Sequence, residues 1–187
     1  MTMIINIWTM DGRLHAFRQT NLHDVEVVLA HMRQPDHLFE KALIVSTSLC
    51  TSLIAGHAIA RIEAVSHEID MEKLLADHAI QLVSLDPGVE SSPHSGKVGA
   101  KSMVRVDLRL LGETTFSAGY ENDTPSLART DILQELARVF DACWFYYKIG
   151  ESGIGLVNTR AVTNIDIHAD NLVLPGDAWH ANDGTFE

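Results

Sequence analysis

Residues 103–110 read MVRVDLRL and alternate apolar and charged side chains. A period of two places the apolar residues on one face of a strand and the charged residues on the other. Residues 111–113, LGE, supply the glycine of a turn, and TTFSAGY at 114–120 resumes the extended pattern. This stretch therefore predicts a half-buried β-hairpin, and the rest of the chain can be compared with it.

A helix and a second hairpin follow in the sequence. Thr130 is a candidate N-cap, and apolar residues at helical spacing predict an amphipathic helix over residues 131–142. The segment WFYYKIGESGIGLVN at 144–158 has the pattern of a strand, a glycine-rich turn and a return strand, and RAVTNIDI at 160–167 extends it. Residues 103–170 thus form a predicted hairpin-helix-hairpin unit.

The beginning of the chain has the same order of elements. MIINIWTM at 3–10 and RLHAF at 13–17 flank an Asp-Gly turn, a strong hairpin signal. Asn21 and Asp24 resemble a capping box before a helical apolar stripe that Pro35 should end. Residues 42–56 and 57–65 are again extended. We expect a first hairpin-helix-hairpin unit over residues 1–70.

The two units also match in detail. Gly12 and Gly112 lie 100 positions apart at the first turns, and AIARIE at 58–63 aligns with AVTNID at 161–166, 103 positions later. We infer a degenerate internal duplication of 3–70 and 103–170. Two unrelated units of similar hairpin composition would give a comparable match, so this alternative stays open. The predicted fold class is α+β, with two related units and antiparallel sheets.

The remaining segments join or follow the units. Residues 70–82, DMEKLLADHAIQL, have the apolar spacing of a helix, and the Ser, Gly and Pro-rich stretch at 84–102 is a candidate flexible loop. The expected organisation is 1–70, a connecting helix and loop at 71–102, 103–170, and a tail at 171–187. That tail is expected to pack across the sheet or to reach a neighbouring subunit.

Charge and composition exclude several classes of function. The 187 residues carry a net charge of −11, and Lys and Arg are scattered, which argues against nucleic-acid binding. No apolar run is long enough to cross a membrane, and the first residues lack the features of a signal peptide, so we expect a cytoplasmic protein. Cys50 and Cys143 form no recognisable disulfide or metal pattern and are expected to be reduced and buried or half-buried.

The stretch STSLCTS at 46–52 raises the possibility of a nucleophile. As one strand over 42–50 it would place Ser46, Ser48 and Cys50 on the same face. A catalytic serine or cysteine commonly stands at a tight strand-to-helix turn of the G-x-S-x-G type, and none occurs here. We therefore interpret Ser46 and Ser48 as ligand-facing residues of a strand and predict no catalytic residue.

Neither the histidines nor the glycines indicate a cofactor. The ten histidines show no metal-ligand spacing such as H-x-H or H-E-x-x-H, so no metal site is predicted. Gly150, Gly153 and Gly155 precede a β pattern rather than a helix, which favours a hairpin turn over a phosphate-binding loop. No cofactor is expected.

These observations favour a non-enzymatic binding or interaction module that holds a small ligand or a protein partner, with a homo-oligomer as one form that it could take. The paired turns near His57 and at Asn158 and Arg160 are the first candidate site. Tyr146, in the aromatic run 144–147, is expected on an outer face where it could stack on a ligand.

Two alternatives remain open. A small hydrolase or transferase, with or without a metal, could use His67, Asp70, His168 and Asp170, since enzymes assemble their residues from distant segments. The chain could also be a structural component of a larger assembly.

Overall fold

The computed structural model describes most of the two predicted units. Its described residues are 1–46, 50–69, 82–85, 102–112, 114–122, 129–150 and 152–168, together with 174 and 178. Ser48, Asp70 and Asp170 lie outside the described residues, as do most of the predicted helix at 70–82, the loop at 84–102 and the tail at 171–187. The described part is an α+β structure in which strands dominate and helices are few.

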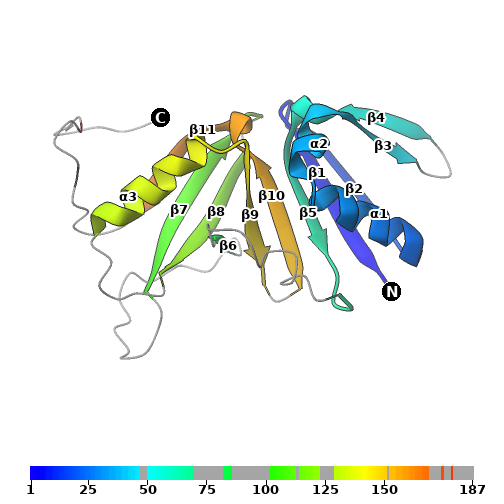
Figure 1. Cartoon of the computed structure of the whole chain (residues 1–187), viewed down its shortest axis with the longest axis horizontal. Helices are drawn as coiled ribbons and strands as arrows, with labels where there is room; N and C mark the ends of the chain where they lie inside the picture. Colours follow the sequence, from blue (N-terminus) through cyan, green and yellow to red (C-terminus); the bar gives the residue numbers. More distant parts are fainter. Residues whose placement is uncertain are drawn as a thin grey trace.

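Nine described strands form one sheet in the order β11-β7-β8-β6-β9-β10-β5-β1-β2 (Figure 1). Neighbours pair antiparallel except β6 and β9, which run parallel. The strands are β1 Met3–Thr9, β2 Leu14–Gln19, β5 Ile59–Val65, β6 Leu82–Ser84, β7 Ser102–Leu110, β8 Thr114–Asn122, β9 Trp144–Ile149, β10 Gly153–Asn158 and β11 Val162–His168. Because β10 pairs with β5, the sheet is continuous from the second half of the chain to the first.

A separate hairpin, β3 Ala42–Ser46 and β4 Thr51–Ala55, stands apart from this sheet. The expectation of one strand over 42–50 is wrong, because β3 ends at Ser46 and β4 begins at Thr51. The stretch STSLCTS therefore spans the connection of a hairpin. Its short polar side chains compete with the sheet for backbone hydrogen bonds, which makes such residues common in turns.

The helices begin and end for identifiable reasons. In α1, Leu22–Met32, the backbone N–H of His23 donates to Oδ1 of Asn21 at 2.9 Å, which confirms the predicted N-cap. Pro35 ends this helix as expected and also begins α2, Pro35–Glu40, which the sequence pattern did not predict. The third helix, α3 Arg129–Ala137, starts one residue before the predicted cap and continues as the 3-10 turn η3, Arg138–Phe140.

Two apolar clusters lie on opposite faces of the sheet. The first contains the buried residues of α1 and α2, and the second contains those of α3. Leu156 of β10, paired with Ile62, belongs to the first cluster, whereas the next residue, Val157, belongs to the second. Successive side chains of a strand point to opposite faces, so β10 is covered on both sides, and all of its residues are buried. Figure 1 shows α1 and α2 beside β1 and β5, and α3 beside β7 and β11.

Neither Cys50 nor Cys143 forms a disulfide, and both are exposed, so the expectation that they are buried or half-buried is wrong. Cys50 lies in the connection of the β3–β4 hairpin, and Cys143 lies in the turn that precedes β9. Among the described helices, none is long and apolar enough to span a membrane.

Candidate functional site

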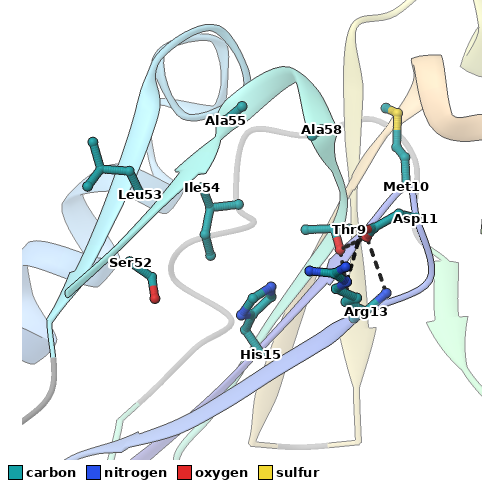
Figure 2. Close-up of a pocket in the computed structure, with 10 residues that line it drawn as sticks. All are labelled: Thr9, Met10, Asp11, Arg13, His15, Ser52, Leu53, Ile54, Ala55 and Ala58. Atoms are coloured by element: carbon teal, nitrogen blue, oxygen red, sulfur yellow. Dashed lines mark hydrogen bonds and ion pairs between the residues drawn. The ribbon is translucent and has the colours of Figure 1, made fainter. Parts of the chain in front are cut away.

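A groove of about 700 Å³ separates the first hairpin turn from β4 (Figure 2). One wall is Thr9, Met10, Asp11, Arg13 and His15, from the end of β1, the turn and the start of β2. The other wall is Ser52, Leu53, Ile54 and Ala55 of β4 with Ala58. In Figure 2, His15 points toward Ser52 and Ile54 across the groove, whereas Leu53 points away. The groove therefore lies between the sheet and the separate hairpin.

The Asp-Gly turn positions the polar wall. Gly12 has φ +82°, a conformation that favours glycine, and its N–H donates to the carbonyl of Thr9 at 2.9 Å. The hydroxyl of Thr9 donates to Oδ1 of Asp11 at 2.5 Å, and Nε of Arg13 lies 3.1 Å from Oδ2 of the same carboxylate. These contacts hold a carboxylate and a guanidinium side by side at one end of the groove.

The electrostatics of the turn follow from these contacts. The hydrogen bond from Thr9 is the main cause that lowers the pKa of Asp11; desolvation acts against it, and the backbone N–H and the guanidinium of Arg13 lower the pKa further. Asp11 is thus ionised at neutral pH. At the opposite wall Ile54 is buried and uncharged, so the groove offers a polar end and an apolar side. An arrangement of this kind can bind an amphipathic molecule by hydrogen bonds and apolar contact.

Ser46 lies at the far end of the β3–β4 hairpin. Its hydroxyl is hydrogen-bonded to that of Thr51 at 2.9 Å, and both side chains are exposed. The other end of β3, at Ala42, pairs with Ala55 next to the 3-10 turn η1, Gly56–Ala58. Four residues of strand separate the two ends by about 13 Å. Ser46 is therefore not brought together with His57.

His57 and Arg160 are exposed residues of two 3-10 turns, η1 and η4, Thr159–Ala161. Asn158, 1% exposed, links these turns. Its Oδ1 accepts from the N–H of Arg160 at 3.1 Å, and its amide donates to the carbonyl of Ile59 at 2.9 Å. The two turns thus lie close together, and the side chain of Asn158 is hydrogen-bonded to backbone groups of both.

Tyr146 is not on an outer face, so that expectation is wrong. It is 3% exposed, packs in the first apolar cluster, and its hydroxyl donates to the carbonyl of Met32. Phe145 and Tyr147 pack in the second cluster on the opposite face. The alternation along β9 was correctly predicted, but both faces of this strand are covered, which a single-strand pattern cannot reveal.

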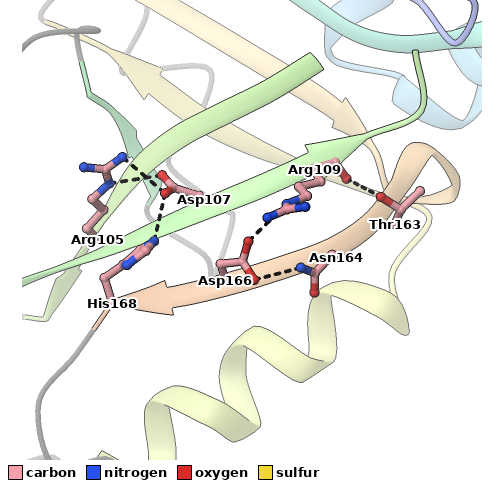
Figure 3. Close-up of polar contacts among 7 residues, drawn as sticks. All are labelled: Arg105, Asp107, Arg109, Thr163, Asn164, Asp166 and His168. Atoms are coloured by element: carbon pink, nitrogen blue, oxygen red, sulfur yellow. Dashed lines mark hydrogen bonds and ion pairs between the residues drawn. The ribbon is translucent and has the colours of Figure 1, made fainter. Parts of the chain in front are cut away.

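A second polar group of side chains lies on β7 and β11, on the face opposite α3 (Figure 3). Asp107 accepts hydrogen bonds from Arg105 at 3.1 Å and is paired with Nε2 of His168 at 2.8 Å. Arg109 donates to Asp166 at 3.2 Å. Burial raises the pKa of Asp107, but hydrogen bonds from Ser117, Arg105 and His168 outweigh it, so that pKa lies below its ordinary value.

The alternative enzyme site is only partly described. His168 is engaged with Asp107, and His67 lies after β5 in an exposed turn. Among the residues that the structure describes, no group of three or more His, Cys, Asp or Glu side chains could hold a metal ion.

Sequence reasoning missed the residues of the groove. The signal for one wall was present, since Arg13 and His15 flank an Asp-Gly turn. The approach of β4 to this turn depends on how the β3–β4 hairpin packs, and no local pattern contains that information.

Comparisons of the chain with protein-family models, with curated proteins and with solved structures found no match. The geometry of the groove therefore carries the functional proposal.

Proposed function

We propose that the protein is a non-enzymatic binding module built from two duplicated units, and that the groove of the first unit holds a small ligand. The observation that carries the proposal is a difference between the units: the place that is hollow in the first is filled by aromatic rings in the second.

The strand registers support the duplication. Ile7 pairs with Ile62 in the first unit and Leu108 with Ile165 in the second, which corresponds to offsets of 101 and 103 residues. On the other side of the same strands, Ile7 pairs with His15 and Leu108 with Phe116. Each unit thus has its long central strand between the same two neighbours in the same register.

Irregular features recur as well. A shift in register interrupts β1–β5 after Trp8, and another interrupts β7–β11 between Val162 and Asn164, at the corresponding place. The N–H of Met10 donates to the carbonyl of Ala58, and that of Leu111 to Ala161, both at 2.8 Å. Bulges and turn contacts are specific to a fold, so their repetition favours common origin over similar composition.

The corresponding residues differ at the groove. His15 occupies the place of Phe116. Ser52, which pairs with Val45, occupies that of Gly155, which pairs with Tyr147. In the second unit the Phe116 ring is 3% exposed and lies 4.3 Å from the ring of Tyr147. In the first unit smaller or more polar side chains leave the groove open. Exchange of a buried phenylalanine ring for the more polar His15 is unfavourable for packing, and a bound ligand would offset this loss.

The lining defines the ligand class. Arg13 and His15 can donate hydrogen bonds to an acidic or carbonyl group, and Thr9 and Ser52 add hydroxyl groups. Ile54 and Ala58 provide an apolar side. We propose a small amphipathic molecule that carries at least one hydrogen-bond acceptor and one apolar part.

Native mass spectrometry of gently purified protein tests this proposal. The wild-type chain should carry a non-covalent mass of a few hundred daltons that denaturation releases. His15→Phe introduces the ring that the second unit has, so it should lose this mass while the fold is kept. His31→Phe, at an exposed position of α1, is the matched control and should retain it. Absence of bound mass in the wild type, or its retention by His15→Phe, would contradict the proposal.

The paired turns remain a second predicted contact. His57 of η1 and Arg160 of η4 are both exposed, and η1 also contributes Ala58 to the groove. Alanine at both positions should weaken binding of the same ligand. An unchanged affinity would remove these two residues from the site and leave the groove as its sole location.

A further inference from the structure

We propose that copies of this chain assemble head to tail, with β4 of one copy pairing antiparallel with β11 of the next. This inference rests on the proposed duplication, because it extends to a second copy the seam that joins the two units of one chain. It does not depend on the ligand.

The outer face of the β3–β4 hairpin is uncharged and exposed. It consists of Ala42, Ile44, Ser46, Thr51, Leu53 and Ala55, all of which are exposed. Ile44 and Leu53 stand directly opposite each other and are 66% and 71% exposed. Leu43 and Ile54, on the other face, pack against the first apolar cluster. The hairpin is therefore attached to its own unit by one face and presents an apolar pair on the other.

The corresponding hairpin of the second unit is covered on both faces. Tyr146 and Leu156 occupy the places of Ile44 and Leu53 and are 3% and 0% exposed. They are buried because β10 pairs with β5 and the hairpin packs on the α1 and α2 side of the first unit. The second hairpin thus shows how such a hairpin binds another unit: its outer strand pairs with an edge strand, and one of its faces is buried against that unit.

In the first unit, β5 is the strand that receives the second hairpin. The second unit has a corresponding strand, and no described hairpin pairs with its outer edge. Strand β11 corresponds to β5 but ends the order of nine strands, and among the described strands only β7 pairs with it. Ile165 and Ile167 are half-buried, whereas Ile62 and Ala64, their counterparts in β5, are 2% and 0% exposed.

The neighbouring 3-10 turn shows the same difference. Phe140 of η3 is 53% exposed, whereas Leu38 of α2, its counterpart, is 6% exposed. Within the described part of the chain, the second unit therefore lacks at this position the cover that the first unit has.

A second copy is the occupant that fits both surfaces. The exposed hairpin and the exposed strand belong to the same chain, and their counterparts already bind each other in the β10–β5 seam. Each surface presents apolar side chains, Ile44 and Leu53 on the hairpin and Ile165 and Ile167 on β11. Among the described strands none pairs with the outer edge of β11, so its backbone groups can pair with another strand. Because the two surfaces differ, the contact is heterologous and produces a closed ring or an open filament.

The β10–β5 seam also fixes the register. Gly153 pairs with Val65 and Leu156 with Ile62 in that seam. Transfer by the offset of 103 residues places Cys50 opposite His168, and Leu53 opposite Ile165, of the next copy. The native thiol of Cys50, which is exposed, can therefore report the contact.

Two end-blocking variants test the assembly. Ile44→Asp puts a charge on the hairpin face, and Phe140→Asp puts one on the receiving side. By light scattering during size-exclusion chromatography, the wild type should be oligomeric and each variant should lose the larger species. An equal mixture of the two variants should form a one-to-one dimer, since one intact hairpin then meets one intact strand. Leu22→Asp, at an exposed position of α1, is the control and should assemble like the wild type.

Disulfide trapping tests the register in a Cys143→Ser background. His168→Cys should give a ladder of covalent oligomers with the native Cys50 on oxidation, and Cys50→Ser should abolish it. Asn164→Cys lies on the same side of β11 about 13 Å away and should not cross-link. A monomeric wild type, variants that fail to combine, or equal cross-linking at position 164 would overturn the proposal. His15→Phe should leave assembly intact, so failure of the ligand proposal is distinguishable.

Discussion

The backbone of Gly112 lies directly against that of Gly12. A Cβ atom on Gly112 would come within 2.5 Å of the Gly12 nitrogen and 2.9 Å of the carbonyl oxygen of Met10. A Cβ atom on Gly12 would come within 3.0 Å of the carbonyl oxygen of Gly112. The first turns of the two units thus contact each other through backbone atoms, and both glycines have positive φ, +82° and +85°.

Gly112→Ala should destabilise the protein through both effects. The left-handed conformation costs about 1–2 kcal/mol for a residue with a Cβ atom, and the contact with the Gly12 backbone adds to this. We expect a total loss of at least about 3 kcal/mol in the free energy of unfolding, measured by urea denaturation. Gly150→Ala is the control, because Gly150 also has positive φ (+54°) but a Cβ atom there would meet nothing within 4 Å. Equal losses in the two variants would show that the turns do not touch.

Gly155→Ala should be costly because of one ring. Gly155 pairs with Tyr147 across β9–β10, and a Cβ atom would come within 1.9 Å of the ring. The same ring passes over β10 to β5, where its hydroxyl donates to Glu63 at 2.6 Å. Overpacking of this kind costs about 1–3 kcal/mol. In a Tyr147→Leu background the cost of Gly155→Ala should fall by about 1 kcal/mol or more, as a double-mutant cycle would measure. Additive losses would contradict the contact.

Local patterns predicted most strands and turns but not the covered faces. The strand MVRVDLRL and the two glycine turns could be predicted from their own residues, because alternation and positive φ are properties of short segments. By contrast, β10 reads GIGLVN, and its glycines were interpreted only as turn residues. Gly155 is needed inside the strand for the Tyr147 ring, a requirement that appears only when β9, β10 and β5 are side by side.

The candidate site was less predictable for a related reason. The sequence repeat paired the turn near His57 with the turn of Asn158 and Arg160, and in the structure Asn158 links the two by donating to the carbonyl of Ile59. Their role in binding stays a prediction. His15 was overlooked, because only the strand registers align it with Phe116, and these registers cannot be read from the sequence. Under the proposed duplication, the sequence reveals the repeat where residues are kept, and function is expected where the corresponding residues differ.

Asn158→Ala should show whether this residue is structural. The substitution would leave the N–H of Arg160 and the carbonyl of Ile59 without their side-chain partner at a site where Asn158 is 1% exposed. Two such groups together should cost about 3 kcal/mol in the free energy of unfolding. Asn21→Ala, which removes the exposed cap of α1, should cost about 1 kcal/mol. If the two alanine variants lose equal stability in thermal or urea unfolding, the Asn158 contacts do not link the turns.

Alkaline unfolding should depend on Tyr146. Burial is the main cause that raises its pKa from 10.0 to about 12, and the nearby Asp36 carboxylate acts in the same direction. Because the pKa is higher in the folded than in the unfolded chain, the stabilisation is fully present below pH 10 and is lost as the pH rises through about 12. The loss amounts to about 2–3 kcal/mol for a shift of this size.

Tyr146→Phe isolates this contribution. At neutral pH the variant should be less stable by about 1 kcal/mol, because the hydrogen bond to Met32 is removed. Burial also raises the pKa of Tyr120 and Tyr147, but both remain in the variant, so their effects cancel in the comparison. The stability difference should therefore shrink or reverse between pH 10 and 12. Tyrosinate absorbance of the wild type should likewise stay low near pH 10 in water and rise there in urea. A parallel loss of stability in both proteins, or ordinary ionisation of all three tyrosines in the folded wild type, would place Tyr146 in contact with solvent rather than in the core.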